Sequence, residues 1–148
     1  MGKALVAYYS RSGTTEKMAA YIAEGVRFSG NAAVTAKISE LKNEKDFEGY
    51  DAVVLGCPTY HKDITENFKT FLFLADKAKL AGKLGGAFGP STHSGEAPGI
   101  VFDTMEHVFK MTMTPLGPFR LMENLVSTDE GMRSCQTYGK AIGDKLGA

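Results

Sequence analysis

The stretch LVAYYSRSGTTEKMAAYIAEGV, residues 5–26, decides the fold of this 148-residue chain. It lies across the end of an apolar run, Lys3–Tyr9, that is rich in strand formers, as a buried parallel strand should be. From Thr14 the apolar spacing changes to i, i+3, i+4, i+7, which is a helical period; the residues that carry it are Ala19, Ile22, Ala23 and Val26. The stretch therefore predicts a strand that passes into a helix through a short polar loop.

Four further strands are predicted along the chain. They are a weaker strand at Ala33–Ile38, a clear buried strand at Asp51–Pro58, a short apolar strand at Lys83–Gly89, and a strand within residues 112–126 that Pro115 and Pro118 interrupt. The polar segment Ser39–Tyr50 holds at most a short helix.

Helical patterns separate these strands. One includes Phe68, Phe71, Leu72 and Ala75, one begins with Pro98 as a first helical residue, and one follows a capping box at Ser127–Glu130. Strands and helices that alternate in this way predict an α/β fold, with a parallel sheet covered by helices on both faces. Ligands of such sheets bind beyond the carboxyl ends of the strands, so the loops after strands one, three and four are the places to search.

Composition narrows the function classes. The 17 basic and 17 acidic residues give no net charge, which argues against a general nucleic-acid binder. Two cysteines, Cys57 and Cys135, suggest neither a disulfide framework nor a zinc site. Met1-Gly2-Lys3 runs straight into the first apolar segment, and no apolar run approaches the ~18 residues of a membrane span. We therefore expect a cytoplasmic protein with no membrane segment.

The first loop, Ser10–Thr15, is suited to an anion. It lies at a predicted helix N-terminus, whose N–H groups and dipole favour negative charge. Its hydroxyls add donors, and Gly13 permits positive φ or a close backbone approach. A phosphate monoester fits these features, while the alternative that Ser12 or Thr14 merely caps the helix stays open.

Rival phosphate chemistry is not supported by this loop. The chain lacks the nucleoside triphosphatase motif G-x-x-x-x-G-K-[ST], and its first turn lacks the dinucleotide fingerprint G-x-G-x-x-G. A response-regulator receiver has the same order of elements but needs carboxylates for Mg²⁺ after strands one and three. Ser10-Arg11 and Pro58-Thr59 stand at those positions.

The other two loops add planar and polar groups. Residues 57–63 bring Tyr60 and His61 to the same sheet edge, and residues 88–95 add small polar residues and His93. A flat heterocycle that carries a phosphate would suit the crevice between the three loops.

These loops resemble those of one known family. SRSGTT, residues 10–15, is similar position by position to the T-x-T-G-N-T loop of flavodoxins, with Thr14 in place of the asparagine. GCPTYHKDITENFKTFL, residues 56–72, resembles the G-x-P-T-x-x-G segment of flavodoxin-like quinone reductases. AFGPSTHSGEA, residues 87–97, resembles the fourth loop of the flavin domains of flavodiiron proteins. Over essentially its whole length the chain looks like a short-chain flavodoxin.

The resemblance implies a flavodoxin-like three-layer α/β/α sandwich in one domain, residues 1–148, with a five-stranded parallel sheet of order 2-1-3-4-5. It also implies non-covalent FMN. The phosphate would be held by Ser10, Arg11, Ser12, Gly13, Thr14 and Thr15, and the isoalloxazine ring would lie among Pro58, Thr59, Tyr60, His61, Lys62, Gly89, Ser91, Thr92, His93, Ser94 and Gly95.

Two residues depart from the family pattern. Lys62 stands where the related reductases have glycine, and we expect a non-glycine residue to resist positive φ there. His93 stands where flavodiiron domains often carry tryptophan, and an imidazole can be charged near neutral pH.

Three functions are compatible with such a flavin protein. The first is an electron carrier, a monomer that meets a reductase or ferredoxin-type donor and an acceptor enzyme only transiently. The second is an FMN-dependent NAD(P)H:quinone-type oxidoreductase, and the third is a non-catalytic FMN-binding module. We expect the carrier, because the chain is compact and shows no spare segment for a nicotinamide site. We find no nucleophile–base pair, so the chemistry would be that of the flavin itself.

Overall fold

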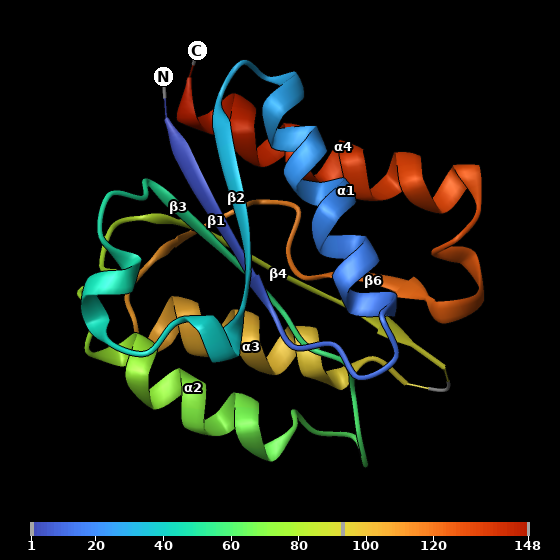
Figure 1. The fold of residues 1–148 in the computed structure, drawn as a ribbon, viewed down its shortest axis with the longest axis horizontal. Coiled ribbons are helices and arrows are strands. Elements are labelled where there is room, and N and C mark those ends of the chain that lie inside the picture. The colour runs from blue at the N-terminus through green and yellow to red at the C-terminus, as the bar shows by residue number, and fades with distance from the viewer. Residues whose placement is uncertain (1, 93, 148) are drawn as a thin grey trace.

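The fold is built on one parallel sheet, seen in the computed structural model, which describes residues 2–92 and 94–147 (Figure 1). Its strands run in the order β2-β1-β3-β4-β5, and β6 also pairs with β4. This confirms the expected order 2-1-3-4-5. The strands are β1 (Lys3–Tyr8), β2 (Ala32–Lys37), β3 (Ala52–Gly56), β4 (Leu84–Ser91), β5 (Thr112–Met113) and β6 (Phe119–Met122).

Helices cover both faces of the sheet. In Figure 1, α1 (Thr14–Phe28) and α4 (Asp129–Leu146) lie on one side, and α2 (Glu66–Asp76) and α3 (Glu96–His107) lie on the other. Three short 3₁₀ helices complete the described chain: η1 (Ile38–Glu40), η2 (Glu44–Phe47) and η3 (Glu123–Leu125). Two buried clusters of apolar side chains, one on each side of the sheet, form the core, as a sheet with helices on both faces requires.

The packing of α1 against α4 depends on glycine. A Cβ atom at Gly139 would collide with the backbone carbonyl of Ile22, and one at Gly25 would collide with that of Gln136. The backbones of the two helices therefore approach so closely that a methyl group does not fit between them.

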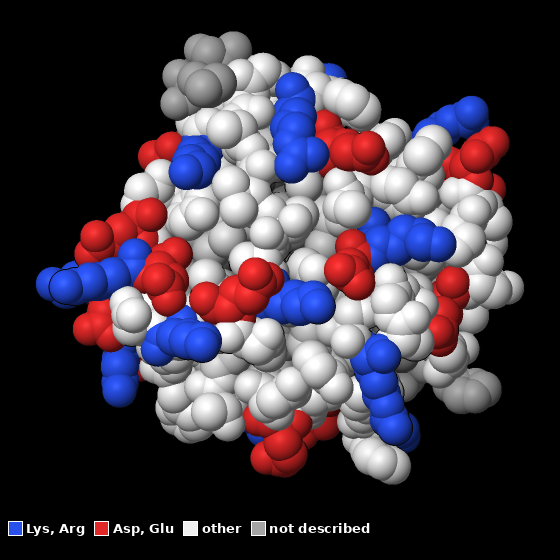
Figure 2. All heavy atoms as spheres, viewed as in Figure 1, with Lys and Arg blue, Asp and Glu red and all other residues white. Residues whose placement is uncertain are grey.

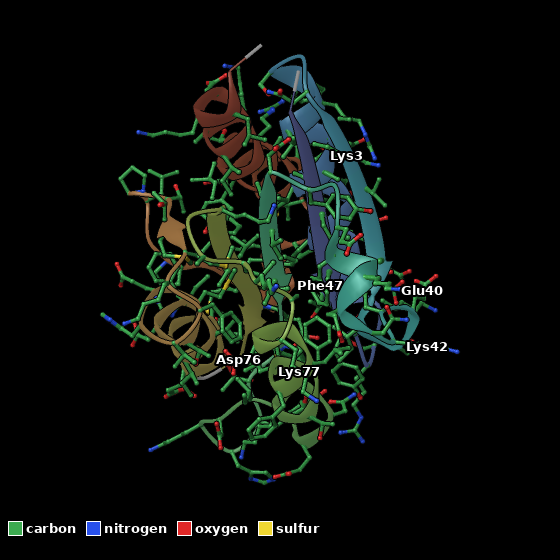
Figure 3. All side chains as sticks on the ribbon, turned by 90° about the vertical axis from the view of Figure 1, so that its left-hand side faces the viewer. Lys3, Glu40, Lys42, Phe47, Asp76 and Lys77 are labelled. Carbon is green, nitrogen blue, oxygen red and sulfur yellow. The ribbon has the colours of Figure 1, made fainter. Side chains whose placement is uncertain are left out.

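The polar segment after β2 folds as two short 3₁₀ helices. Figure 3 shows Phe47 pointing into the molecule while Lys42 points away from it. The Phe47 side chain is buried, and its ring centre lies 5.8 Å from that of Phe71 on α2. One aromatic side chain thus anchors this segment to the core.

Several predicted boundaries were wrong. β4 runs to Ser91 instead of ending at Gly89, because its final residues pair with β6, with Ser91 opposite Met122. Helix α3 begins at Glu96, so Pro98 lies inside its first turn. The N–H groups of a first turn have no acceptor within the helix, so proline, which lacks an N–H, costs no hydrogen bond there.

The start of α4 also differs from the prediction. Its N-cap is Thr128, whose hydroxyl accepts from the Gly131 N–H at 3.0 Å, so the capping box predicted from Ser127 is wrong.

The fifth strand is divided, as the two prolines predicted. β5 pairs with the start of β4 and β6 with its end, and residues 114–118 connect them. The Tyr138 hydroxyl on α4 donates to the Gly117 carbonyl at 2.8 Å and accepts from the Ala87 N–H at 3.2 Å. Tyr138 therefore ties the connecting segment to the centre of β4.

Candidate cofactor site

A cleft opens at the carboxyl edge of the sheet, where the chain leaves β1, β3 and β4. Its volume is about 140 Å³, and it lies where the strand order reverses, the usual ligand position in such sheets. The residues that line it are Arg11, Ser12, Thr14, Thr15, Pro58, Thr59, Tyr60, Pro90, Ser91, Thr92 and Glu123. All three predicted loops therefore contribute to one cleft.

The first loop presents an uncapped helix end. Gly13 is the N-cap of α1, has φ +94°, and leaves the helix without a side-chain cap. The alternative that Ser12 or Thr14 merely caps α1 is therefore wrong. The Ser10 hydroxyl accepts from the Gly13 N–H at 3.0 Å, so this side chain holds the loop in shape.

Hydroxyl groups face the cleft from this loop. The Ser12 and Thr14 hydroxyl oxygens lie 3.3 Å apart, and the Thr14 hydroxyl donates to Glu123 Oε1 at 3.4 Å. Thr15 is buried at the cleft floor. Arg11 is exposed, and its guanidinium lies 5.5 Å from the centre of the Tyr60 ring.

The second loop forms a tight hairpin. Tyr60 and Asp63 exchange two backbone hydrogen bonds of 2.9 Å, and the residues between them, His61 and Lys62, have φ of +51° and +62°. Lys62 thus has positive φ against the steric preference expected of a non-glycine residue, because both residues adopt the conformation that a two-residue hairpin with a type I′ turn requires. The two backbone hydrogen bonds between Tyr60 and Asp63, which form an isolated β-bridge outside the sheet, hold this turn despite its steric cost.

The hairpin is tied to helix α2. Asp63 forms an ion pair with Lys69 at 2.8 Å and also accepts from the Ile64 N–H at 2.7 Å. The hydrogen bond with Lys69 holds the pKa of the Asp63 carboxyl below its usual value. Only the base of the hairpin, at Tyr60, reaches the cleft, since His61 and Lys62 are exposed at its tip and do not line it.

The third loop contributes through the end of β4. Ser91 and Thr92 line the cleft, but Gly89 is inside the strand, where a Cβ would collide with the carbonyl of Cys57. Ser94 and Gly95 precede α3 and do not line the cleft. His93 lies outside the described residues.

Two further hydrogen bonds fix the third loop. The Ala97 N–H at the start of α3 donates to the Thr59 hydroxyl at 3.0 Å, which joins the second and third loops. Arg120 Nε on β6 donates to the Gly95 carbonyl at 2.6 Å.

The Tyr8 phenol and the Cys57 thiol, in the segments that lead into the first and second loops, both have raised pKa values. Burial, and then the hydrogen bond of 3.0 Å from its hydroxyl to Glu16, raise the pKa of Tyr8 to about 12. Burial at the end of β3 raises the pKa of the Cys57 thiol to about 11. Both groups stay protonated at neutral pH and supply no nucleophile.

Two residues of the cleft were not predicted, Pro90 and Glu123. Glu123 follows β6 directly, and β6 ends beside the end of β4. Its position after the last strand was a signal that it reaches the same sheet edge, but the interruption of that strand obscured it.

The residues present suit the phosphate of a flavin. The first N–H groups of α1, which no side chain caps, can donate hydrogen bonds to a phosphate, and so can the hydroxyls of Ser12, Thr14 and Thr15. The described lining residues include no lysine, so these neutral donors carry the anion-binding character. A second hollow of about 310 Å³ shares Ser91, Thr92 and Glu123 with the cleft. The cleft and this hollow together have the dimensions of a small-molecule site, with Tyr60 as a planar wall.

The fold and the site define an α/β protein with a cleft at the carboxyl edge of its sheet, lined by hydroxyl groups that suit a phosphate. Comparison with known families gives a match to the family described as Flavodoxin over residues 6–134, and the chain belongs to that family. Flavodoxins bind FMN and transfer electrons, and this chain is an FMN-binding electron-transfer protein.

The relatives of this chain include flavodoxins and a protein named as an enzyme. A flavodoxin from Clostridium saccharobutylicum is 27% identical, with 97% of each chain covered. A protein named NAD(P)H dehydrogenase (quinone) from Cupriavidus metallidurans is 31% identical over 79% of this chain and 71% of its own. The solved structure of a flavodoxin from the domain Archaea has a TM-score of 0.87 at 26% identity, covering 99% of both chains.

Proposed function

We propose that this protein carries electrons between transient protein partners, with FMN seated in the cleft at the carboxyl edge of the sheet. The observation that supports this most strongly is the meeting of the first-loop hydroxyls, the Tyr60 ring and the end of β4 in that one cleft. When bound, FMN supplies the redox chemistry, and the protein supplies binding, orientation and electrostatics.

Each part of the cleft takes a separate role in this proposal. Ser12, Thr14, Thr15 and the first N–H groups of α1 hold the phosphate, and Ser10 keeps Gly13 in place for them.

The flavin ring lies between the second and third loops. Tyr60, with Pro58 and Thr59, borders the ring from one side. Ser91 and Thr92 border it from the β4 side, near Ser94 and Gly95. Arg11, His61 and Lys62 lie on the exposed rim, where a partner would meet the flavin edge.

The proposed partners are a reductase or ferredoxin-type donor and an acceptor enzyme. Figure 2 shows basic and acidic side chains intermingled over one face of the molecule, in keeping with the zero net charge of the chain. A mixed surface favours small, short-lived contacts over steering by one strong field.

We further propose that residues 1–148 form one domain that works as a monomer in the cytoplasm. None of the described helices is long and apolar enough to cross a bilayer.

A second candidate is an NAD(P)H:quinone oxidoreductase. The similarity to the Cupriavidus metallidurans protein of that name favours it. The sequence match covers about 71% of that relative. The relative therefore has further residues from which a nicotinamide or quinone site can be built. We rank this function second.

Anaerobic titration of the FMN-loaded protein separates the two functions. The carrier should be reduced slowly by NADH or NADPH alone and rapidly by dithionite-reduced ferredoxin. It should then pass its electrons to an acceptor protein such as a cytochrome. Fast reduction by NAD(P)H together with multiple turnovers of a quinone would contradict the carrier and support the enzyme.

A further inference from the structure

The carboxylate of Glu123 lies in the part of the cleft that the phosphate would occupy. Glu123 begins η3 immediately after β6, and the pairing of Ser91 with Met122 brings it to the end of β4. Its Oε1 atom accepts a hydrogen bond of 3.4 Å from the Thr14 hydroxyl at the start of α1. One acidic side chain therefore closes the cleft between the first loop and the end of the sheet.

This carboxylate opposes the anion-binding character of the first loop. Among the described lining residues, Glu123 is the one acid and Arg11 the one cation. The guanidinium of Arg11 lies over the Tyr60 ring, on the side of the cleft formed by the second loop. A phosphate at the start of α1 thus meets hydroxyls, N–H groups and a negative charge.

The hydrogen bond to Thr14 adds a second effect. A threonine hydroxyl has one proton to donate, and here Glu123 accepts it. To donate to a phosphate, the Thr14 hydroxyl has to rotate away from the carboxylate, which leaves two negatively charged groups facing each other across it.

We propose that Glu123 is a specificity-determining residue that reduces the preference of this site for phosphorylated over unphosphorylated flavin. The inference rests on the proposed placement of the FMN phosphate at residues 10–15. Because its carboxylate repels the phosphate and engages Thr14, FMN is held less tightly than the hydroxyl groups alone would hold it. Riboflavin, which lacks the phosphate, is not subject to this penalty.

Substitution of Glu123 by glutamine tests the proposal, because glutamine keeps the shape and the acceptor for Thr14 but removes the charge. The Kd of each flavin is measured by flavin fluorescence quenching at low and high salt. We expect E123Q to bind FMN about 5- to 10-fold more tightly at low salt, and to bind riboflavin with an unchanged Kd. The gain should shrink as salt screens the repulsion.

Two further variants make the test decisive. Glu123→Lys should tighten FMN binding more than glutamine does. If E123Q folds poorly, the FMN and riboflavin Kd values of Glu123→Lys still test the proposal. Glu106→Gln, which removes the same charge from the far end of α3, should leave both Kd values unchanged.

The outcomes separate the inference from the proposed function. Equal tightening of FMN and riboflavin in E123Q, or no change for FMN, would overturn the role of Glu123 and leave the flavin site in place. Weaker FMN binding would also overturn it, and would mean that the carboxylate accepts a hydrogen bond from the flavin. A wild-type protein that binds neither flavin would overturn the proposed site itself.

Discussion

The guanidinium of Arg11 lies 5.5 Å from the centre of the Tyr60 ring, so a cation–π contact joins the loop after β1 to the hairpin after β3. Lysine cannot replace this contact fully, because it lacks the planar group that covers an aromatic face. The contact connects two walls of the cleft that lie about 50 residues apart in the sequence.

A double-mutant cycle of Arg11→Ala with Tyr60→Leu should give a coupling of about 0.5–1 kcal/mol in urea unfolding, the range for exposed cation–π pairs. Arg11→Lys should lose most of the same coupling. A lysine variant that keeps all of it would show that Arg11 acts through its charge alone.

The hydroxyls of the first loop should discriminate between flavins. Replacing Ser12 and Thr14 together by alanine should weaken FMN binding by about 100-fold or more, since each hydrogen bond to a charged group such as the phosphate contributes about 1.5 kcal/mol or more. Riboflavin binding should hardly change, and Kd values from fluorescence quenching give both answers. Equal weakening of FMN and riboflavin binding would show that the phosphate does not bind at this loop.

The hairpin tip is strained at Lys62, where φ is +62°. Glycine has no steric penalty there, so Lys62→Gly should raise the free energy of unfolding by about 0.5–1 kcal/mol, after allowance for the greater entropy of glycine in the unfolded chain. The matched control is Lys77→Gly at the C-cap of α2, where φ is −79°. This control should destabilise the protein in urea unfolding. A loss of stability at both positions would contradict the strain at the hairpin.

The contact between α1 and α4 should not tolerate a methyl group at Gly139. Gly139→Ala forces the two helix backbones apart and should cost about 3 kcal/mol or more, because the obstacle is the Ile22 carbonyl and not a flexible side chain. Thr137→Ala, on the exposed side of the same helix, should be neutral or slightly stabilising. Thermal unfolding of both variants by circular dichroism checks this, and equal melting temperatures would refute the close approach.

Alkaline pH should weaken the fold through Tyr8. The pKa of Tyr8 is raised in the folded protein to about 12 from an ordinary value of 10.0, so folding favours the protonated phenol. The resulting stability is fully present below pH 10 and is lost as the pH rises from 10 toward 12, because the unfolded chain ionises first.

Urea unfolding at several pH values between 8 and 11.5 measures this loss. Tyr8→Phe has no proton to release and should show a shallower decline above pH 10 than the wild type. Cys57→Ala is a useful second variant, since the raised pKa of that thiol acts in the same direction. An identical decline in the wild type and Tyr8→Phe would assign the alkaline sensitivity to other groups.

Much of the fold follows from local patterns. Strand β1 and helix α1 were predictable because an apolar run and a helical period meet at Ser10–Thr15. The end of β4 and the start of α3 were not predictable locally. The extension of β4 to Ser91 depends on its pairing with β6, a segment that comes some thirty residues later in the chain.

The site divides in the same way. Ser12, Thr14, Thr15 and Tyr60 were predictable because each follows a strand at the edge where ligands bind. Glu123 was missed because its approach to Thr14 depends on the register of a broken strand. The positive φ of Lys62 could not be foreseen from residue type, since the paired backbone of Tyr60 and Asp63 overrides the preference of a lysine.

The divided fifth strand also has a consequence for association between chains. An unbroken strand at the border of a sheet offers a row of free N–H and C=O groups to which a strand of another molecule can add. Here that border consists of segments of two and four residues, separated by a connection that contains Pro115. Proline has no N–H to donate, and neither segment is long enough to template a stable ladder. The interruption thus protects this side of the molecule against aggregation.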